Sequence, residues 1–376
     1  MNLSVGIVGF PNVGKSTLFN AVLKKQQALT ANYPFATIEP NTGVVEVPDK
    51  WLKPLAQVVK DEEKLEDLPP IIPAVVTFID IAGLVKGAHK GEGLGNQFLS
   101  HIREVTAICH ILRDFDDDSI IREGSTDPKT DLEVIRIELA LKDLETLNKQ
   151  KEPKGKQDPS EKERWNAVLK FKSALENNIW VKKIIDEEKN PNTKQTLENT
   201  AKLLNLLTAK DEIFVVNIDE QKLKTQNIPN LTDYYQKLLN EPKEKIIVMN
   251  NKLEMDLAGF TEEEQKELLK EYGLQRPALE RLINTAYKTL GLLSFYTAGK
   301  KEVRAWTIKK GSTAQKAAGT IHSDFEKLMI SAKIVKAQDF VTYKGWHNCK
   351  EQGKIRIESR DYIMQEDEVA EFNIGK

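Results

Sequence analysis

The sequence predicts an α/β fold built around a phosphate-binding loop. An apolar run at 3–8 is followed directly by the string G-F-P-N-V-G-K-S-T at 9–17. Further short apolar runs, separated by helical stretches, lie at 74–79, 105–112, 212–217 and 245–249. Short buried runs that alternate with helices are typical of a parallel sheet. We therefore expect a nucleotide-binding sheet domain of the P-loop type.

The string at 9–17 fits G-x-x-x-x-G-K-[ST] between a strand and a helix that we expect to begin near Lys15. Gly9 and Gly14 let the backbone turn tightly and point N–H groups at phosphate oxygens, to which the helix N-terminus adds its dipole. The Lys15 ammonium can reach the β and γ phosphates, and the Ser16 hydroxyl can ligate Mg²⁺. We take as nucleotide-binding residues Asn12, Val13, Gly14, Lys15, Ser16 and Thr17, with Lys15 also catalytic.

Downstream residues complete a site for Mg²⁺ and the γ-phosphate. Asp80 follows the run at 74–79 in the string D-I-A-G, where a carboxylate can hold Mg²⁺ through a water and Gly83 can donate its N–H to the γ-phosphate. In the segment between, Thr37 is the expected second hydroxyl ligand, the alternative being a surface-loop threonine. We therefore expect Ser16, Thr37 and Asp80 at the metal and count Gly83 as catalytic.

The string N-I-D-E at 217–220 follows a strand, where a GTPase carries the guanine-reading string Asn/Thr-Lys-x-Asp. Ile218 stands in the place of the lysine and Glu220 in the place of the aspartate, whose carboxylate pairs with guanine. The longer Glu220 is displaced from that bidentate position, whereas Asn217 can pair with the N6/N7 edge of adenine. We expect these three residues to bind the base and adenine to be favoured, with 250–252 as a second loop near the base.

The chain divides by composition into three expected domains. From 128 to 208 it is rich in Leu, Lys, Glu and Asn with apolar residues at helical spacing, interrupted by a polar turn at 149–159. This predicts an inserted, coiled-coil-like helical domain, for which a simple cap and a binding arm are both open. The nucleotide-binding domain then comprises 1–127 and 209–292, and a mixed β domain covers 293–376.

Composition narrows the class of protein. The net charge of −2 identifies no partner, no apolar stretch approaches the ~18–20 residues that span a membrane, and no signal-peptide pattern opens the chain. Cys109 and Cys349 fit neither a disulfide framework nor a metal pattern, so we expect reduced thiols. We expect a cytoplasmic protein with neither a membrane nor DNA as partner.

Positive charge gathers in two places. From Lys300 to Arg360 there are 14 Lys and Arg against 6 Asp and Glu, and at 149–172 there are 8 against 4. The aromatic residues interleaved in the first segment are Trp306, Phe340, Tyr343 and Trp346. A basic patch with aromatics suits RNA or ribosome contact; the alternative is a solvated face over core aromatics.

These strings, in this order, resemble the YchF / Obg-like ATPase family of translation-factor-class P-loop proteins. The matching strings are G-F-P-N-V-G-K-S-T, N-Y-P-F-A-T-I-E-P-N-T-G-V-V, D-I-A-G-L-V-K-G-A-H-K-G-E-G-L-G-N-Q-F-L, N-I-D-E, and F-Y-T-A-G-K-K-E-V-R-A-W-T-I with D-F-V-T-Y-K-G. The resemblance covers essentially the whole chain. It implies a G domain interrupted by a helical domain and followed by a TGS domain, with ATP preferred over GTP, Mg²⁺ dependence and association with the ribosome.

The residue that positions the attacking water is not evident. Leu84 stands where Ras-like enzymes carry a glutamine, a substitution that the resembling family shares, and that family has a histidine in a string like D-x-I-x-H-V. This chain reads D-S-I-I-R-E-G at 118–124, with Arg122 as the nearest counterpart. A guanidinium can stabilise γ-phosphate charge but cannot act as a base. We name Arg122 as a catalytic candidate and treat as structural or solvent-facing His89, His101 and His110.

The leading hypothesis is an ATP-switched, ribosome-associated regulator of translation or stress response with slow intrinsic hydrolysis. Asn12 resembles the asparagine that helps to hold K⁺ beside the phosphates in cation-activated relatives, so K⁺ joins Mg²⁺ as a candidate cofactor. Two alternatives stay open at this point: an Obg-class GTPase, and an RNA-binding module in which the nucleotide is only a structural ligand.

Overall fold

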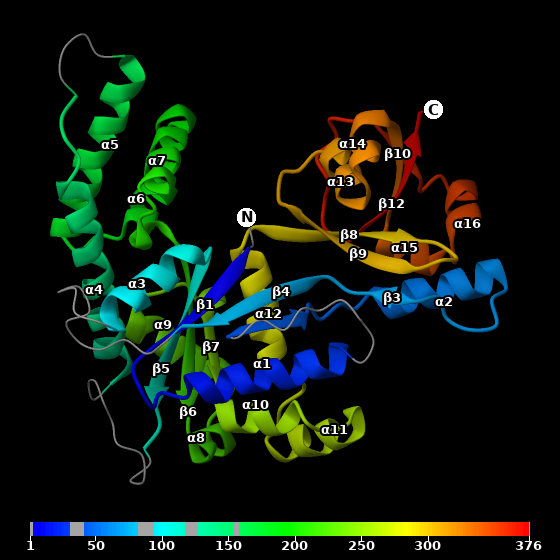
Figure 1. Cartoon of the computed structure of the whole chain (residues 1–376). Coiled ribbons are helices and arrows are strands. Elements are labelled where there is room, and N and C mark those ends of the chain that lie inside the picture. Colours follow the sequence, from blue (N-terminus) through cyan, green and yellow to red (C-terminus); the bar gives the residue numbers. More distant parts are fainter. Residues whose placement is uncertain (1–2, 31–40, 82–93, 117–126, 154–157, 376) are drawn as a thin grey trace. The chain divides into compact units, whose positions relative to one another are not determined.

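The computed structural model describes residues 3–30, 41–81, 94–116, 127–153 and 158–375 (Figure 1). The chain forms two compact units. One comprises Met1–Val44 and Thr77–Leu282, and the other comprises Val45–Val76 and Ile283–Lys376. Each unit has its own sheet, and the two are described separately below.

A six-stranded sheet forms the centre of the first unit. In spatial order its strands are β2 (Thr42–Glu46), β4 (Val75–Asp80), β1 (Ser4–Val8), β5 (Ala107–Asp114), β6 (Asp211–Ile218) and β7 (Ile246–Met249). Five neighbouring strands of this sheet, β4, β1, β5, β6 and β7, pair in parallel. Every residue of β1 and β7 is buried, as expected for parallel strands covered on both faces. The predicted α/β fold class is confirmed.

The helices of this sheet bring four loops to one edge. They are α1 (Lys15–Thr30), α3 (Leu94–Glu104), α8 (Glu220–Thr225), α9 (Ile228–Leu239), α10 (Asn251–Leu257) and α11 (Glu262–Glu271), with the 3₁₀ turn η3 (Lys243–Lys245). Helix α12 (Ala278–Thr289) begins in this unit and continues into the second. Helix α1 begins at Lys15 as predicted and contacts β1 and α10. Because the carboxyl ends of parallel strands meet at one edge, the loops after β1, β5, β6 and β7 lie together.

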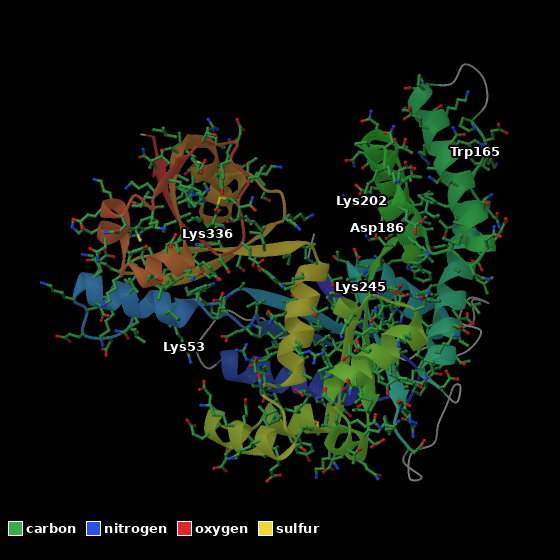
Figure 2. All side chains as sticks on the ribbon, turned by 180° about the vertical axis from the view of Figure 1, so that it is seen from behind. Lys53, Trp165, Asp186, Lys202, Lys245 and Lys336 are labelled. Carbon is green, nitrogen blue, oxygen red and sulfur yellow. The ribbon has the colours of Figure 1, made fainter. Side chains whose placement is uncertain are left out.

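The segment between β5 and β6 forms the predicted helical insertion, green in Figure 1. Its helices are α4 (Pro128–Asn148), α5 (Pro159–Glu176), α6 (Val181–Glu187) and α7 (Pro191–Leu203), followed by the 3₁₀ turn η2 (Leu207–Ala209). Asp127, Asp158 and Asn190 cap three of these helices, each before a proline, which fixes where the helices begin. Helix α5 packs against α4, α6 and α7, so the insertion is a bundle; Figure 2 shows Trp165 on α5 and Lys202 on α7.

A partly buried ion network ties the insertion to the sheet. The Arg136 guanidinium of α4 donates to Glu212 on β6 at 2.7 Å and to Glu241 at 2.6 Å. Its carbon centre lies 5.3 Å from the Trp180 ring and 5.4 Å from the Phe214 ring. Burial alone raises the pKa of Glu212, but Arg136 and the hydrogen bond with His110 hold it at about 2. These ion pairs therefore hold α4 against β6.

The second unit has a mixed sheet of its own. In spatial order its strands are β11 (Arg356–Glu358), β10 (Met329–Lys336), β12 (Glu368–Ile374), β8 (Leu292–Ala298), β9 (Val303–Lys309) and β3 (Ile71–Ile72). Its helices are α2 (Leu52–Glu63), α13 (Ala314–Ile321), α14 (Ser323–Leu328), α15 (Ala337–Thr342) and α16 (Trp346–Glu351). Residues of α13, β8, β10 and β12 share one hydrophobic core. This matches the mixed β unit expected near the C-terminus.

One expected boundary needs correction. The sequence analysis places residues 45–76 in the nucleotide-binding domain, but they belong to the second unit. Strand β3 pairs in parallel with β9, helix α2 contacts β8, β9 and α15, and the Tyr296 hydroxyl donates to Asp49 at 2.8 Å. These partners lie more than 200 positions away in the chain, so no local sequence pattern predicts the contacts.

Two further expectations can be compared with the described residues. Cys109 and Cys349 are both free and buried. Burial raises the pKa of the Cys109 thiol above its ordinary range, so this side chain is part of the core. In the described ranges, no helix has both the length and the apolar character needed to cross a membrane.

Candidate active site

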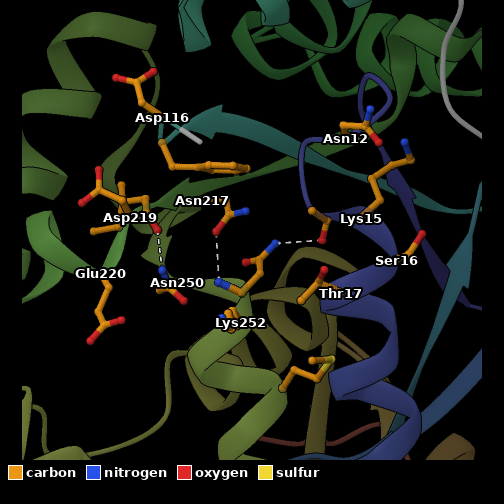
Figure 3. A pocket seen from close by; sticks show the side chains of 15 residues that line it. Asn12, Lys15, Ser16, Thr17, Asp116, Asn217, Asp219, Glu220, Asn250 and Lys252 are labelled. Carbon is orange, nitrogen blue, oxygen red and sulfur yellow. Dashed lines mark hydrogen bonds between the residues drawn. The ribbon is translucent and has the colours of Figure 1, made fainter. Parts of the chain in front are cut away.

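A cavity of about 590 Å³ opens at the carboxyl ends of β1, β5, β6 and β7 (Figure 3). Its volume is in the range of small-molecule and cofactor sites, and its position is where open parallel sheets bind ligands. It is lined by Asn12, Gly14, Lys15, Ser16, Thr17, Phe115, Asp116, Asn217, Ile218, Asp219, Glu220, Asn250, Asn251, Lys252 and Met255. Residues of the loop at 9–17 and of the string at 217–220 therefore line the same cavity.

The phosphate loop passes so close to its neighbours that glycine is required at position 14. Gly14 has φ of +99°, and a Cβ placed on it would lie 2.4 Å from Nδ2 of Asn217 and 3.1 Å from Nδ2 of Asn251. Asn12 also has a positive φ, of 61°. Backbone in this region turns its N–H groups inward, as a phosphate-binding nest requires.

Two asparagines hold the loop in place. Asn217 donates from Nδ2 to the Val13 carbonyl at 3.0 Å and accepts at Oδ1 from the Asn251 N–H at 3.0 Å. Asn251 in turn donates from Nδ2 to the Gly14 carbonyl at 3.1 Å. The Asn217 amide, which was expected to read adenine, thus has both of its polar ends engaged by protein groups. Its observed role is to connect the phosphate loop to the β6 and β7 loops.

Lys15 and Asp80 form the charged part of the phosphate end. The Lys15 ammonium is buried and donates to the carbonyls of Gly9 at 3.0 Å and Phe10 at 2.9 Å. Burial lowers the pKa of Lys15, and the Asp80 charge opposes this. Burial raises the pKa of Asp80, and Lys15 opposes that shift. The two charges therefore lie near enough to stabilise one another at the end of β4.

Asp80 also has an oxygen that suits a metal ion. Its Oδ1 atom is buried and accepts no hydrogen bond from any described residue. Buried carboxylate oxygens without a donor are costly unless a cation or water satisfies them. Carboxylate and hydroxyl oxygens are the donors that Mg²⁺ prefers, so Asp80 and Ser16 fit this ion. The other predicted phosphate-end residues, Thr37, Gly83 and Arg122, lie outside the described residues.

The base end of the cavity contains residues that the sequence analysis missed. Phe115 and Asp116 follow β5, and Met255 lies on α10. The Arg113 guanidinium lies 4.3 Å from the Phe115 ring centroid and donates from Nε to the Phe115 carbonyl at 3.2 Å. Arg113 is only 3% exposed. It covers one face of the Phe115 ring, which leaves an aromatic wall in the cavity where the base of a nucleotide would lie.

The predicted base readers behave differently from expectation. Ile218 lines the cavity, but it is fully buried and belongs to the hydrophobic core that the sheet shares with α9. Glu220 is 60% exposed and accepts from Lys224 at 2.7 Å and from the Tyr272 hydroxyl at 2.9 Å. Figure 3 shows the Glu220 carboxylate turned away from Asn217. The carboxylate that stands in the place of the guanine-reading aspartate is therefore held by Lys224 and Tyr272.

Residue Asp219, which also lines the cavity, shapes the loop beside it. Its Oδ1 atom caps α8 by accepting from the Lys222 N–H at 2.6 Å. The Lys222 ammonium reaches back to the Asp114 carboxylate at 3.0 Å, and the Tyr235 hydroxyl donates to that same carboxylate. The ends of β5 and β6 are thereby fixed to α8 and α9. Four elements, β5, β6, α8 and α9, therefore hold the base end of the cavity in place.

Comparison with known proteins agrees with this site. Residues 4–152 match a family model described as "50S ribosome-binding GTPase", and residues 292–375 match the YchF-GTPase C-terminal model, described as "Protein of unknown function (DUF933)". The chain is 43% identical over 384 residues to the protein named "Ribosome-binding ATPase YchF" from Escherichia coli O157:H7, covering 99% of each chain. The chain belongs to the YchF family.

Other YchF proteins align along the same full length. The protein of the same name from Bacillus subtilis strain 168 is 42% identical over 383 residues and is covered completely. A solved structure described as the Schizosaccharomyces pombe YchF GTPase is 37% identical, with a TM-score of 0.83 over 99% of this chain and 98% of that one. The resemblance inferred from the motifs is thus confirmed.

Of the three histidines named in the sequence analysis of this YchF-family chain, two lie within the described residues. His101 is exposed on α3. His110 is fully buried, stacks on Phe214 and contacts Glu212 through Nε2 at 2.8 Å. Both therefore have the solvent-facing or structural positions expected of them. His89, like Leu84, lies outside the described residues.

Proposed function

We propose that this YchF-family chain is a magnesium-dependent ATPase that associates with the ribosome. The observation that carries the proposal is a cavity that joins the phosphate loop to a base end where the Glu220 carboxylate, bonded to Lys224 and Tyr272, is turned away from Asn217. The curated relatives named above are called ribosome-binding ATPases, whereas the solved relative is called a GTPase. The base end of this chain favours ATP over GTP, in line with the name ATPase.

The phosphate end assigns a role to each of its residues. Backbone N–H groups from Val13 to Thr17 and the N-terminus of α1 would hold the phosphates. Lys15 would exchange its carbonyl partners for the β and γ phosphate oxygens, which bind an ammonium more strongly. Ser16, Thr37 and Asp80 would hold Mg²⁺, which supplies charge stabilisation for the transferred phosphoryl group. Gly83 would add a backbone N–H.

The base end favours adenine through shape and stacking. The Phe115 ring, held by Arg113, would stack on the base, an interaction that tolerates any base. Preference against guanine then follows because the Glu220 carboxylate, which stands in the place of the guanine-reading aspartate, is held by Lys224 and Tyr272. The guanine N1–H and N2 amine would lack that partner on binding. Asn217 and the Ile218 backbone would contribute by fixing the loop beside the base, and Glu220 by staying turned away.

Hydrolysis by this site alone is expected to be slow. Leu84 cannot orient water, and Arg122 can only stabilise charge on the γ-phosphate. We propose that a partner, the ribosome, or K⁺ held beside Asn12 completes the site. A ribosomal partner also implies a cytoplasmic location. The C-terminal unit, which we equate with a TGS domain, and the helical insertion would then supply contacts outside the nucleotide site.

A turnover assay with a matched control tests the proposal. We expect Lys15→Ala to abolish release of phosphate from ATP, because the charge that neutralises the γ-phosphate is lost. Lys202→Ala removes an exposed lysine of α7 in the same unit and should leave turnover unchanged. Equal turnover in the two variants would show that this loop is not the active site. GTP turnover exceeding ATP turnover in the unmodified protein would instead favour the GTPase alternative.

A further inference from the structure

A second cavity, of about 580 Å³, lies in the C-terminal unit, remote in sequence from the nucleotide site. It is lined by residues at the end of β8, in the turn that follows, and on β9, β12, α13, α14 and α16. Its aromatic members are Trp306, Phe325, Trp346 and Phe372. Two lysines, Lys300 and Lys301, stand at the turn between β8 and β9 on its rim.

The aromatic walls are held firmly. Trp306, Phe325 and Phe372 are partly buried and pack against the core of the unit. The indole Nε1 of Trp306 donates to Thr297 Oγ1 at 2.9 Å, and the Arg304 guanidinium lies 4.1 Å from its ring. Trp346 meets the fully buried Phe340 edge to face, with ring centroids 5.3 Å apart. Rings fixed in this way lose little entropy when a flat ligand stacks on them.

The rim of this cavity is slightly cationic. Glu302 lies 3.8 Å from Arg304, Glu371 lies 3.0 Å from Lys333, and Lys300 lies 2.6 Å from Glu63. Each rim carboxylate thus has a cation beside it, and the exposed Lys301 adds a further positive charge. An occupant that combines an aromatic ring with a negative charge fits such a site better than a neutral or cationic one.

We propose that this cavity binds an unstacked base of single-stranded RNA, with the exposed Lys301 at the adjacent phosphate. RNA is read mainly where bases are splayed out and stacked on aromatic side chains, and stacking works for every base. The volume is in the range of small-ligand sites. The proposal rests on the proposed ribosome association and specifies its chemistry. It also reduces the set of aromatic residues predicted to contact RNA, because Phe340 is buried in the core and Tyr343 does not line the cavity.

Fluorescence anisotropy of the full-length protein with labelled octamers of uridine and of adenosine tests this site. We expect Trp306→Leu to weaken RNA binding about tenfold, since stacking on one base is lost while an apolar side chain still covers the core. Lys301→Glu should weaken it about fivefold through charge at the phosphate. Lys309→Glu, an exposed lysine on β9 outside the cavity lining, carries the same change of charge and is the control.

The outcomes separate the site from the wider proposal. Equal weakening by Lys301→Glu and Lys309→Glu, or unchanged binding in Trp306→Leu, would overturn the cavity as the RNA site. A protein that co-sediments with ribosomes but binds neither octamer would overturn the RNA inference and leave the proposed ribosome association standing. Failure to co-sediment would instead count against the proposed function itself. ATP turnover and melting temperature should be unchanged in Lys301→Glu, which confirms that the variant is folded.

Discussion

Replacing Asn217 by alanine distinguishes a residue that reads the base from one that supports the phosphate loop. The Asn217 amide has two buried hydrogen bonds, to the Val13 carbonyl and from the Asn251 N–H, each of 3.0 Å. Truncation leaves both partner groups buried and unsatisfied, at a cost of about 1–3 kcal/mol each. The loss of about 2–6 kcal/mol is divided between folding and nucleotide binding. We expect nucleotide affinity to fall about 10- to 100-fold.

The decisive expectation is that the affinity for ATP and the affinity for GTP fall by the same factor. Titration calorimetry of both nucleotides with Mg²⁺ measures this directly, together with the melting temperature. Asn227→Ala is the matched control, because Asn227 is exposed and its side chain makes no cap hydrogen bond at α9. A variant that loses ATP affinity while keeping GTP affinity would show that Asn217 reads adenine, and would refute the role inferred from the geometry.

Other replacements test the remaining parts of the account. Gly14→Ala should abolish nucleotide binding, because its Cβ would lie 2.4 Å from Asn217; calorimetry checks this. Phe115→Ala should weaken ATP by about 1–3 kcal/mol through lost stacking, and an unchanged Kd would remove the ring from the site. Ile218→Lys should lower stability by several kcal/mol rather than improve GTP binding, since it buries an ammonium in the core, as a melting curve with both nucleotides will show. Arg136→Met should cost about 3–5 kcal/mol in urea unfolding near pH 7, because Glu212 is left buried and charged. In the unmodified protein the pKa of Glu212 is lowered from 4.5 to about 2, so its pair contributes stability above about pH 4.5 that is lost as the pH falls toward 2. Stability that is flat over that interval would contradict the pairing.

The parts of the site that follow from local pattern were predictable. The loop at 9–17, its helix starting at Lys15 and the strand before Asp80 are each specified by neighbouring residues. The helical insertion was predictable for the same reason, since Asp127 and Pro128 begin α4 at the expected place. The packing of the insertion into a bundle was not predictable. Its core is formed by residues from several helices that lie far apart in the sequence.

The parts that depend on long-range contact were missed. Phe115 lies in a segment without a motif, and only its position beside Arg113 at the edge of the sheet reveals the aromatic wall. The role of Asn217 depends on Val13, about 200 positions away in the chain. Glu220 was judged by its length, whereas its direction is set by Lys224 and Tyr272. The sequence thus indicates which residues gather, and the packing decides what each of them does.

Calorimetric titration of the unmodified protein with ATP and with GTP, each in Mg²⁺, tests the central claim most directly. The base end presents an aromatic wall at Phe115 and turns the Glu220 carboxylate away from Asn217. We therefore expect ATP to bind more tightly than GTP, by about tenfold or more, since a guanine would leave polar groups unpaired. Tighter binding of GTP would contradict the assignment of this site as an ATPase.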